Sequence, residues 1–507
     1  MTESRVINFE PAWTLSELSR EIQAGNVSSE TAVKTYLQRI ELLDRAGPRL
    51  QSVLSINPDA IKQAQALDME LKNGKSRGPL HGVPILIKDN IETADNMPTT
   101  AGALALKDNL NGRDAPLVAN LRAQGAVVLG KTNLSEWANF RSTKSISGWS
   151  ALGGQTRNPH ILDRSPCGSS AGSGAAMAAH LAAGTIGTET NGSIICPATS
   201  NGIVGFKPTV GLVSQEFIIP ISSTQDTAGP MTLTVRDAAL MLDGMVSGSR
   251  SLRFTGQLSS DGLKGKRVGV LRFAEGDMHE INLMFSEALD VLEDAGAILI
   301  DIDEFEAPDG FWSDAFDVLK VEFKATLNNY LASTGSAVKT RSLADIIAYN
   351  VTISDQEMPL FDQDIFEMSE AKAGLDDPAY LESLTKILRA TRENGLDNFI
   401  KDYNVELVVV PSRGPSFLIN PVTGDNAGGG PGAGWLAAIA GYPHLSVPMG
   451  EMRGLPIGIS FMGPAGSDAE ILSAGHAYEI RSKKRMDPVF LPSAEQSERI
   501  KKAFIRN

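Results

Sequence analysis

The chain has 507 residues, 42% of them hydrophobic, and a formal net charge of −14 from 46 Lys and Arg against 60 Asp and Glu. This length and apolar content predict a sizeable core, in one large domain or in two or three ordinary ones, and argue against intrinsic disorder. The negative charge and the lack of a basic run argue against nucleic acid or an anionic membrane as the main partner.

Neither a membrane span nor a targeting segment is expected. No stretch of about twenty strongly apolar residues occurs. The start, MTESRVINFEPAW, lacks a charged segment followed by an apolar one, which is what a signal peptide needs. We therefore expect a cytoplasmic location, or a secreted or periplasmic one if a leader has been removed.

Helices are predicted over residues 13–72, where a Thr-x-x-Glu capping box at residues 14–17 precedes an apolar stripe. Residues 85–87 then form a short apolar strand that ends in Lys88. The carboxyl edge of a strand is where α/β sheets carry functional groups. Burial there lowers the pKa of a lysine and makes it a candidate base, although Lys88 could instead reach solvent or pair with Asp89.

Residues 125–132, GAVVLGKT, fit the phosphate-loop pattern G-x-x-x-x-G-K-[ST]. In that motif a strand precedes the first glycine, and the residues between the glycines form the loop that wraps the phosphates. Here the four middle residues, AVVL, are themselves a predicted strand. We therefore predict that this match does not bind a nucleotide.

The stretch 165–209 holds two serine turns. The first is GSSAG at residues 168–172, followed by a small-residue helix and a short strand, and the second is TNGS at residues 190–193. The only cysteines of the chain, Cys167 and Cys196, lie beside these turns. We expect two small buried thiols, because free cysteine is commonly buried, and a disulfide is possible but not required.

The rest of the chain alternates helices and strands. The polar run at residues 222–230 could line a pocket or form a surface loop. The glycine-rich stretch 424–434 could border the site or be a plain connection. Residues 440–448 and 455–461 are predicted to be edge-adjacent strands with prolines at their starts. The fold class is therefore α/β, with a large mixed, mostly parallel sheet covered by helices on both faces. We expect a single domain, divided into an N-terminal helical part (1–75), a catalytic core (76–245), a mainly helical cover (246–402) and a return to the core sheet (403–507).

A serine needs a base to act as a nucleophile, and two arrangements compete. In the first, residues 168–172 form the G-x-S-x-G elbow of an α/β-hydrolase, with Ser170 as nucleophile and His444 or His476 as base. This elbow must follow a strand, and residues 163–167, DRSPC, do not predict one.

In the second arrangement no histidine takes part. Ser193 attacks, Ser169 relays the proton and Lys88 is the base, which is a serine–lysine version of the catalytic triad. Gly192 allows successive amides to turn into one concavity that can hold an oxyanion.

These residues resemble the amidase signature family of serine hydrolases. The resemblance covers most of the chain, in the segments 78–90, 130–138, 167–209, 226–230 and 440–461, and within the family it is greatest to the peptide amidases, through GKTNLSEWANF at 130–140 and PCGSS at 166–170. It implies Lys88 as catalytic base, Ser169 in a cis peptide as relay and Ser193 as nucleophile. It also implies that the oxyanion hole is formed by the backbone amides of Thr190, Asn191, Gly192 and Ser193. The supporting residues that it implies are Gly168, Ser170 and Asp226.

The resemblance implies hydrolysis of a carboxamide to a carboxylate and ammonia, with no metal or cofactor, in a monomer or homodimer that takes a small-molecule or peptide amide. C-terminal amides of peptides or amino-acid amides are the expected substrates. Ile195 stands where many members have Arg, which weakens the case for an acidic substrate anchored there. The alternatives are a general aliphatic or aryl amidase or ester hydrolase, the glutaminase subunit of a tRNA-dependent amidotransferase, and a binding protein on an inactive hydrolase scaffold.

Overall fold

The structure is a computed structural model that describes residues 12–246, 254–426 and 430–504. The start of the chain, for which we expect no signal peptide, lies outside the described residues. The same holds for residues 247–253, in the connection into the helical part, and for residues 427–429 of the glycine-rich stretch.

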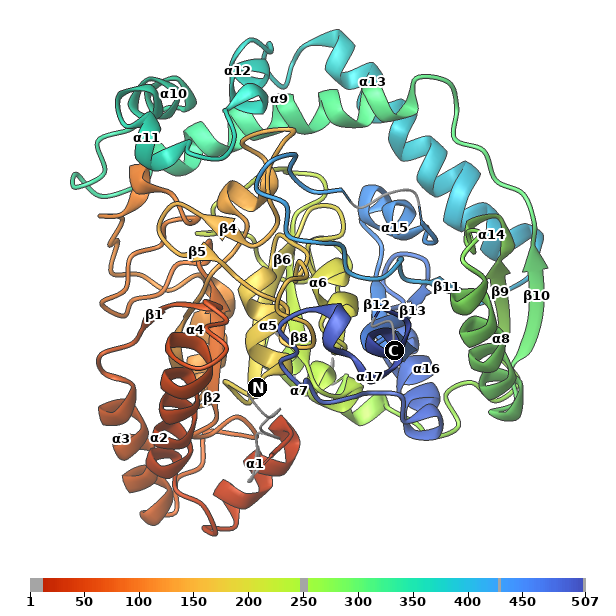
Figure 1. Ribbon diagram of the computed structural model, residues 1–507, viewed down its shortest axis with the longest axis horizontal. Helices are drawn as coiled ribbons and strands as arrows, with labels where there is room; N and C mark the ends of the chain where they lie inside the picture. Colours follow the sequence, from red (N-terminus) through yellow and green to blue (C-terminus); the bar gives the residue numbers. More distant parts are fainter. Residues whose placement is uncertain (1–11, 247–253, 427–429, 505–507) are drawn as a thin grey trace.

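A mixed sheet of 11 strands runs through the molecule (Figure 1). In sheet order its strands are β1 (Val53–Ile56), β3 (Val127–Thr132), β2 (Pro84–Lys88), β6 (Gly184–Glu189), β8 (Thr227–Thr232), β7 (Val204–Lys207), β12 (His444–Met452), β13 (Leu455–Met462), β11 (Leu407–Pro411), β9 (Arg267–Leu271) and β10 (Ile298–Ile302). Parallel pairs join β3, β2 and β6 toward one end and β11, β9 and β10 toward the other. The strands between them pair antiparallel, so the predicted large mixed sheet is confirmed.

The α-helices surround this sheet, and a separate two-stranded ladder joins β4 (Trp149–Ser150) to β5 (Gly154–Gln155). The helices are α1 (Leu15–Gln23), α2 (Ser29–Arg39), α3 (Ala60–Lys72), α4 (Pro116–Ala123), α5 (Ala171–Ala178), α6 (Ile195–Ser200), α7 (Val235–Met245), α8 (His279–Asp294), α9 (Phe311–Ala332), α10 (Leu343–Thr352), α11 (Ser354–Glu357), α12 (Asp364–Glu370), α13 (Pro378–Thr391), α14 (Asp397–Asp402), α15 (Gly434–Ala440), α16 (Asp468–Ser482) and α17 (Glu498–Phe504). Among the described residues, no helix combines the length and the apolar content that crossing a membrane requires.

The two faces of the sheet carry different helices because side chains alternate along each strand. On β12, Leu445 and Val447 belong to the main core together with residues of α8 and α16. The intervening Ser446 faces the other way and hydrogen-bonds Thr199 of α6. Helices α5, α6 and α15 therefore lie on the second face, where α5 is buried along its whole length and consists of small residues apart from Met177.

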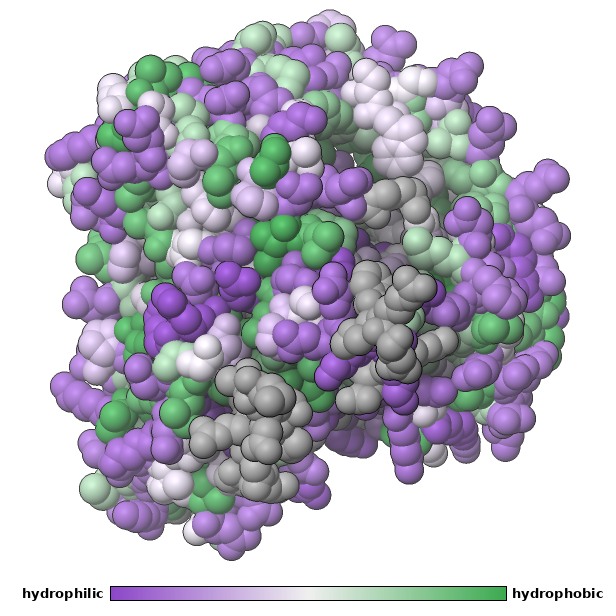
Figure 2. All heavy atoms as spheres, viewed as in Figure 1, coloured by the Kyte–Doolittle hydropathy of each residue, from purple (hydrophilic) through white to green (hydrophobic). Residues whose placement is uncertain are grey.

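Helices α9 to α13 form an arc along one side of the molecule (Figure 1). A second core joins α9, α10 and α12 to the loops around Trp137 and Ile219. The face in view is hydrophilic around its margin, with apolar residues gathered near the centre (Figure 2). The helical part of the chain thus packs onto loops that follow strands of the sheet.

Several predicted elements differ from the structure. Residues 13–72 include the strand β1 as well as helices, and Thr227 begins the buried interior strand β8 instead of belonging to a surface loop. Strands β12 and β13 pair as predicted, but they are interior and not at an edge. The sheet tolerates Pro448 there because the β12–β13 register shifts between this residue and Gly450.

Candidate active site

Lys88 ends β2 and is completely buried. Its Nζ lies 2.7 Å from Ser169 Oγ, 2.8 Å from Thr188 Oγ1 and 3.3 Å from the Thr188 carbonyl oxygen. Burial lowers the pKa of Lys88 from 10.5 to about 7, although the negative charges of Asp226 and Glu189 oppose the shift. A large share of this amine is therefore neutral near pH 7.

Ser169 is also fully buried, in the turn that precedes α5. The Gly168–Ser169 peptide bond is cis, as the resemblance implied. The Ser169 carbonyl accepts a hydrogen bond of 3.0 Å from the Ser135 amide, which ties the turn to the loop after β3. A Cβ at Gly168 would overlap Ser135 Oγ, so only glycine fits this close approach.

Ser193 lies in the turn between β6 and α6 and is partly exposed. Its carbonyl accepts a hydrogen bond of 3.2 Å from the Ser170 amide, which brings the two serine turns together. Within the described part of the chain, the Ser193 hydroxyl has no hydrogen-bond partner, and the amides of Asn191, Gly192 and Ser193 donate to no acceptor. Gly192 has a φ of +84°, a backbone conformation that favours glycine.

Glu189, which the sequence analysis did not single out, organises the amides that follow Ser193. Its Oε2 accepts from the amides of Ile194, at 2.7 Å, and Ile195, at 3.0 Å, at the start of α6. The Ile194 and Ile195 amides therefore have an acceptor, whereas the amides of residues 191–193 remain available to bind an oxyanion. No sequence pattern announces this role, because a carboxylate at the end of a strand can face either way.

Asp226 supports the turn from the other side. Its Oδ1 accepts a 2.6 Å hydrogen bond from Thr190 Oγ1, and its Oδ2 accepts from the amides of Ile221 and Ser222. Burial raises the pKa of Asp226 to about 6, against the lowering effect of these hydrogen bonds. Because it is still mostly ionised near pH 7, Asp226 is a fixed negative charge beside the serine turns.

Glu322 of α9 holds the same loop from the helical cover. It is buried and accepts hydrogen bonds from the hydroxyls of Ser222, Thr224 and Tyr380, the last two at 3.0 and 2.8 Å. This link joins residues about a hundred positions apart, and no periodic pattern or motif in the sequence predicts it.

The histidine-based arrangement is not present. Both backbone groups of Thr188 engage the Ser170 hydroxyl, its N–H donating at 3.2 Å and its C=O accepting at 3.1 Å. His444 is buried and bonded to Ser460, and His476 lies on α16 near Glu479. No strand precedes the turn among the described residues 156–170, as the sequence predicted.

The phosphate-loop match is also explained. Gly130, Lys131 and Thr132 belong to β3, so the segment is extended and does not wrap a ligand. Lys131 is buried, donates to the Ile91 carbonyl at 2.7 Å and lies 3.6 Å from Asp89. Lys131 is thus bonded to groups inside the protein and is not available to bind a phosphate.

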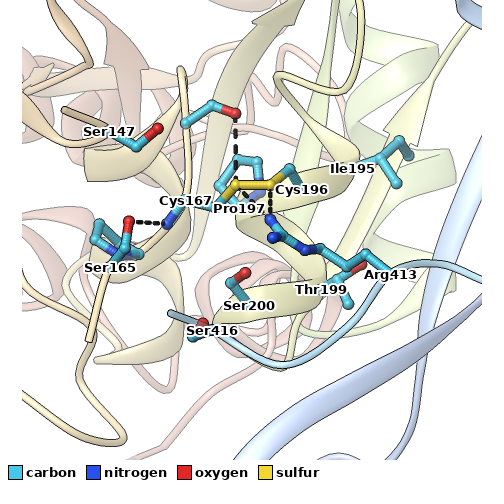
Figure 3. The surroundings of a disulfide bond; sticks show 12 residues. Ser147, Ser165, Cys167, Ile195, Cys196, Pro197, Thr199, Ser200, Arg413 and Ser416 are labelled. Atoms are coloured by element: carbon cyan, nitrogen blue, oxygen red, sulfur yellow. Dashed lines mark hydrogen bonds between the residues drawn. A yellow bond between two sulfur atoms is a disulfide. The ribbon is translucent and has the colours of Figure 1, made fainter. Parts of the chain in front are cut away.

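The prediction of two free thiols is wrong. Cys167 and Cys196 form a disulfide, with their Cα atoms 5.8 Å apart (Figure 3). The first serine turn and α6 bring them within the usual bridging distance, which the separation of 29 residues could not reveal. Across the described residues, no group of three or more His, Cys, Asp or Glu side chains is arranged to hold a metal ion.

Comparison with known proteins gives consistent matches. Residues 31–472 match the Amidase family. A probable amidase of Arabidopsis thaliana is 36% identical, over 94% of this chain and 91% of its own length. A glutamyl-tRNA(Gln) amidotransferase subunit of Thermoanaerobacter pseudethanolicus is 31% identical, over 94% of this chain and 97% of its own length.

Among solved structures, the native peptide amidase from Stenotrophomonas maltophilia is 44% identical, with a TM-score of 0.90 over 95% of this chain and 99% of that one. A structure of the peptide amidase in complex with the competitive inhibitor chymostatin is also 44% identical, with a TM-score of 0.90 over 94% of this chain and 98% of that one.

Proposed function

Because this chain belongs to the amidase family and is an amide-hydrolysing enzyme close in structure to peptide amidase, we propose that it cleaves C-terminal carboxamides of peptides or amino-acid amides through Ser193, Ser169 and Lys88. The observation that carries the proposal is the buried hydrogen bond of 2.7 Å between Lys88 and Ser169. It supplies a base for a serine turn that has no histidine.

The hydrogen bonds of Lys88 suit a neutral amine. A neutral amine has two N–H donors and one lone pair, and Thr188 offers two acceptors, its hydroxyl and its carbonyl. When both N–H groups bond to Thr188, the lone pair is left for the Ser169 hydroxyl. The amine is then satisfied and oriented as a proton acceptor, which is what general base catalysis requires.

The reaction follows from this orientation. Ser193 Oγ attacks the carboxamide carbon, its proton passes to Ser169 Oγ, and the proton of Ser169 passes to Lys88. The open amides of residues 191–193 stabilise the oxyanion, each contributing about 3 kcal/mol. Ammonia leaves with a proton returned along the same relay, and water then hydrolyses the acyl-enzyme.

The substrate class rests on similarity to the peptide amidase of Stenotrophomonas maltophilia over nearly the whole of both chains. Ammonia release from N-acetylated dipeptide amides, compared with simple aryl amides, tests it. We expect the dipeptide amides to be turned over faster, and equal or faster turnover of the aryl amides would refute the peptide-amide assignment.

The roles of the serines are tested by substitution. We expect Ser193→Ala to lose at least about a thousandfold in kcat. We expect Ser170→Ala to keep most of it, because the Ser170 hydroxyl bonds only the Thr188 backbone among the described residues. Loss of activity in Ser170→Ala with retention in Ser193→Ala would favour the hydrolase elbow. Mass spectrometry of the wild type with a slow ester substrate should locate the acyl group on Ser193.

A glutaminase role is the second candidate, because the glutamyl-tRNA(Gln) amidotransferase protein of Thermoanaerobacter pseudethanolicus is 31% identical over most of both chains. A glutaminase of that kind works with a partner. Ammonia release from free glutamine by this chain, faster than from dipeptide amides, would favour that function.

A further inference from the structure

The disulfide joins the two serine turns covalently. Cys167 lies two residues before Ser169, and Cys196 lies three residues after Ser193. The same turns also meet through the hydrogen bond of 3.2 Å from the Ser170 amide to the Ser193 carbonyl. The bridge thus spans the path along which the proposed proton transfer runs.

We propose that this disulfide is a positioning element for the reaction: it holds the Ser193 turn within reach of Ser169, and its reduction by a dithiol lowers turnover. The proposal rests on the roles given to both serines in the proposed function. Neither the family resemblance nor the similarity to solved structures assigns a role to this bridge.

The Ser193 turn is held at its two ends, where Thr190 bonds Asp226 and the Cys196 amide donates to the Gly192 carbonyl at 2.7 Å, but its tip has few side-chain contacts. Asn191 is exposed, Gly192 has open space where a Cβ would point, and the Ser193 hydroxyl is without a partner in the described part of the chain. By contrast, Ser169 is fixed by burial and by Lys88. The Ser193 hydroxyl is therefore less constrained than the Ser169 hydroxyl, and the bridge adds a covalent tie between the turns that carry them.

The surroundings of the bridge favour exchange with a thiol. Arg413, from the loop after β11, directs its guanidinium at the sulfurs of Cys167 and Cys196 (Figure 3). Arg413 is partly buried, and its desolvation lowers its pKa to about 10, so it remains a cation at neutral pH. A cation beside a sulfur stabilises a thiolate and makes it a better leaving group. Cys196 is partly exposed, which gives a reductant access from that side.

The exchange is balanced as follows. A thiolate of the dithiol attacks the Cys196 sulfur, and the S–S bond breaks with its electron pair going to the Cys167 sulfur, which takes up a proton. The second thiol of the reductant then attacks the mixed disulfide and releases Cys196 as a thiol. The protein gains two electrons and two protons, and the dithiol becomes a disulfide.

The test compares the full chain, oxidised and after dithiothreitol, with the Cys167→Ala/Cys196→Ala variant. The probe is an N-acetylated dipeptide amide, and kcat and KM are taken from ammonia release. Thiol titration and thermal unfolding are recorded alongside. Because the chain has only two cysteines, any effect of the reductant that is absent in the variant acts through this bridge.

We expect reduction to lower kcat by about tenfold or more, since small misplacements of reacting groups cost this much, with KM changed less than about twofold. Reoxidation with diamide should restore kcat, and the double variant should match the reduced enzyme and ignore dithiothreitol. A bridge that only stabilises the fold lowers the melting temperature and leaves kcat at 25 °C unchanged, and that result would overturn the proposal.

If dithiothreitol does not reduce the bridge in the native protein, the proposal is tested by the kcat of the double variant alone. If the double variant does not fold, the proposal is tested by the kcat of the reduced wild type. Failure of the proposed function looks different, since the oxidised wild type would then release no ammonia or Ser193→Ala would remain active.

Discussion

The acid limb of the pH profile follows from the burial of Lys88. As the proposed base, Lys88 must be neutral to accept the proton of Ser169, so activity is lost as pH falls through its pKa. Burial places that pKa at about 7 instead of 10.5. The neutral fraction is then about one tenth at pH 6 and about nine tenths at pH 8. We therefore expect kcat/KM to rise about tenfold over this interval and to level off above it.

An exposed lysine gives a different curve. With the ordinary pKa, only about 0.3% of the amine is neutral at pH 8, and the rate keeps rising nearly tenfold per pH unit through pH 9. The plateau, and not the rise alone, is therefore the signature of the buried lysine.

The assay is ammonia release from an N-acetylated dipeptide amide at substrate concentrations far below KM. Such a substrate has no group that titrates between pH 5 and 9, so the fall of kcat/KM at acid pH gives a pKa of the free enzyme. Lys88→Met is the control, and we expect it to lose the limb together with at least about a hundredfold in rate. A wild-type rate that still rises tenfold between pH 8 and pH 9, or an unchanged limb in Lys88→Met, would refute the reasoning.

Three further substitutions test the supports of the site. Gly168→Ala places a Cβ on Ser135 Oγ, so we expect kcat to fall by about a hundredfold, and a wild-type rate would contradict the close approach. Glu322→Ala leaves three hydroxyls, two of them on buried residues, without their acceptor, so urea unfolding should show a loss of roughly 3 kcal/mol, against about 1 kcal/mol for Tyr380→Phe; equal losses would argue against the cluster. Arg413→Gln should slow dithiol reduction of the bridge several-fold in a thiol-release assay, and an unchanged rate would remove the guanidinium from that mechanism.

Local sequence patterns predict some elements closely. The capping box at residues 14–17 begins α1, and the apolar strand at residues 85–87 lies within β2, because each combines a clear pattern with a sharp boundary. The strand Val53–Ile56 was missed because four residues between two helices carry too little pattern, and its place at the sheet edge comes from pairing with β3.

The candidate site could be predicted where chemistry and position coincide along the chain. Lys88 stands at a strand end after three apolar residues, so both its place and its burial could be expected. The partners of the lysine were not predictable, because Thr188 meets it only through the register of β2 against β6. The disulfide was not predictable either, because the distance between the two cysteines depends on how two turns that are separate in the sequence pack together.

The three serines of the two turns are equivalent as residue types, and their surroundings separate them. A nucleophile must reach the substrate and needs a free hydroxyl, whereas a relay must be shielded and bonded to the base. Ser170 is saturated by the Thr188 backbone and Ser169 is buried against Lys88, so neither is free to attack a substrate. Ser193 alone of the three is partly exposed. Burial and hydrogen bonding thus leave one hydroxyl bonded to the base, one bonded to backbone and one partly exposed, and the proposed mechanism needs the first as relay and the last as nucleophile.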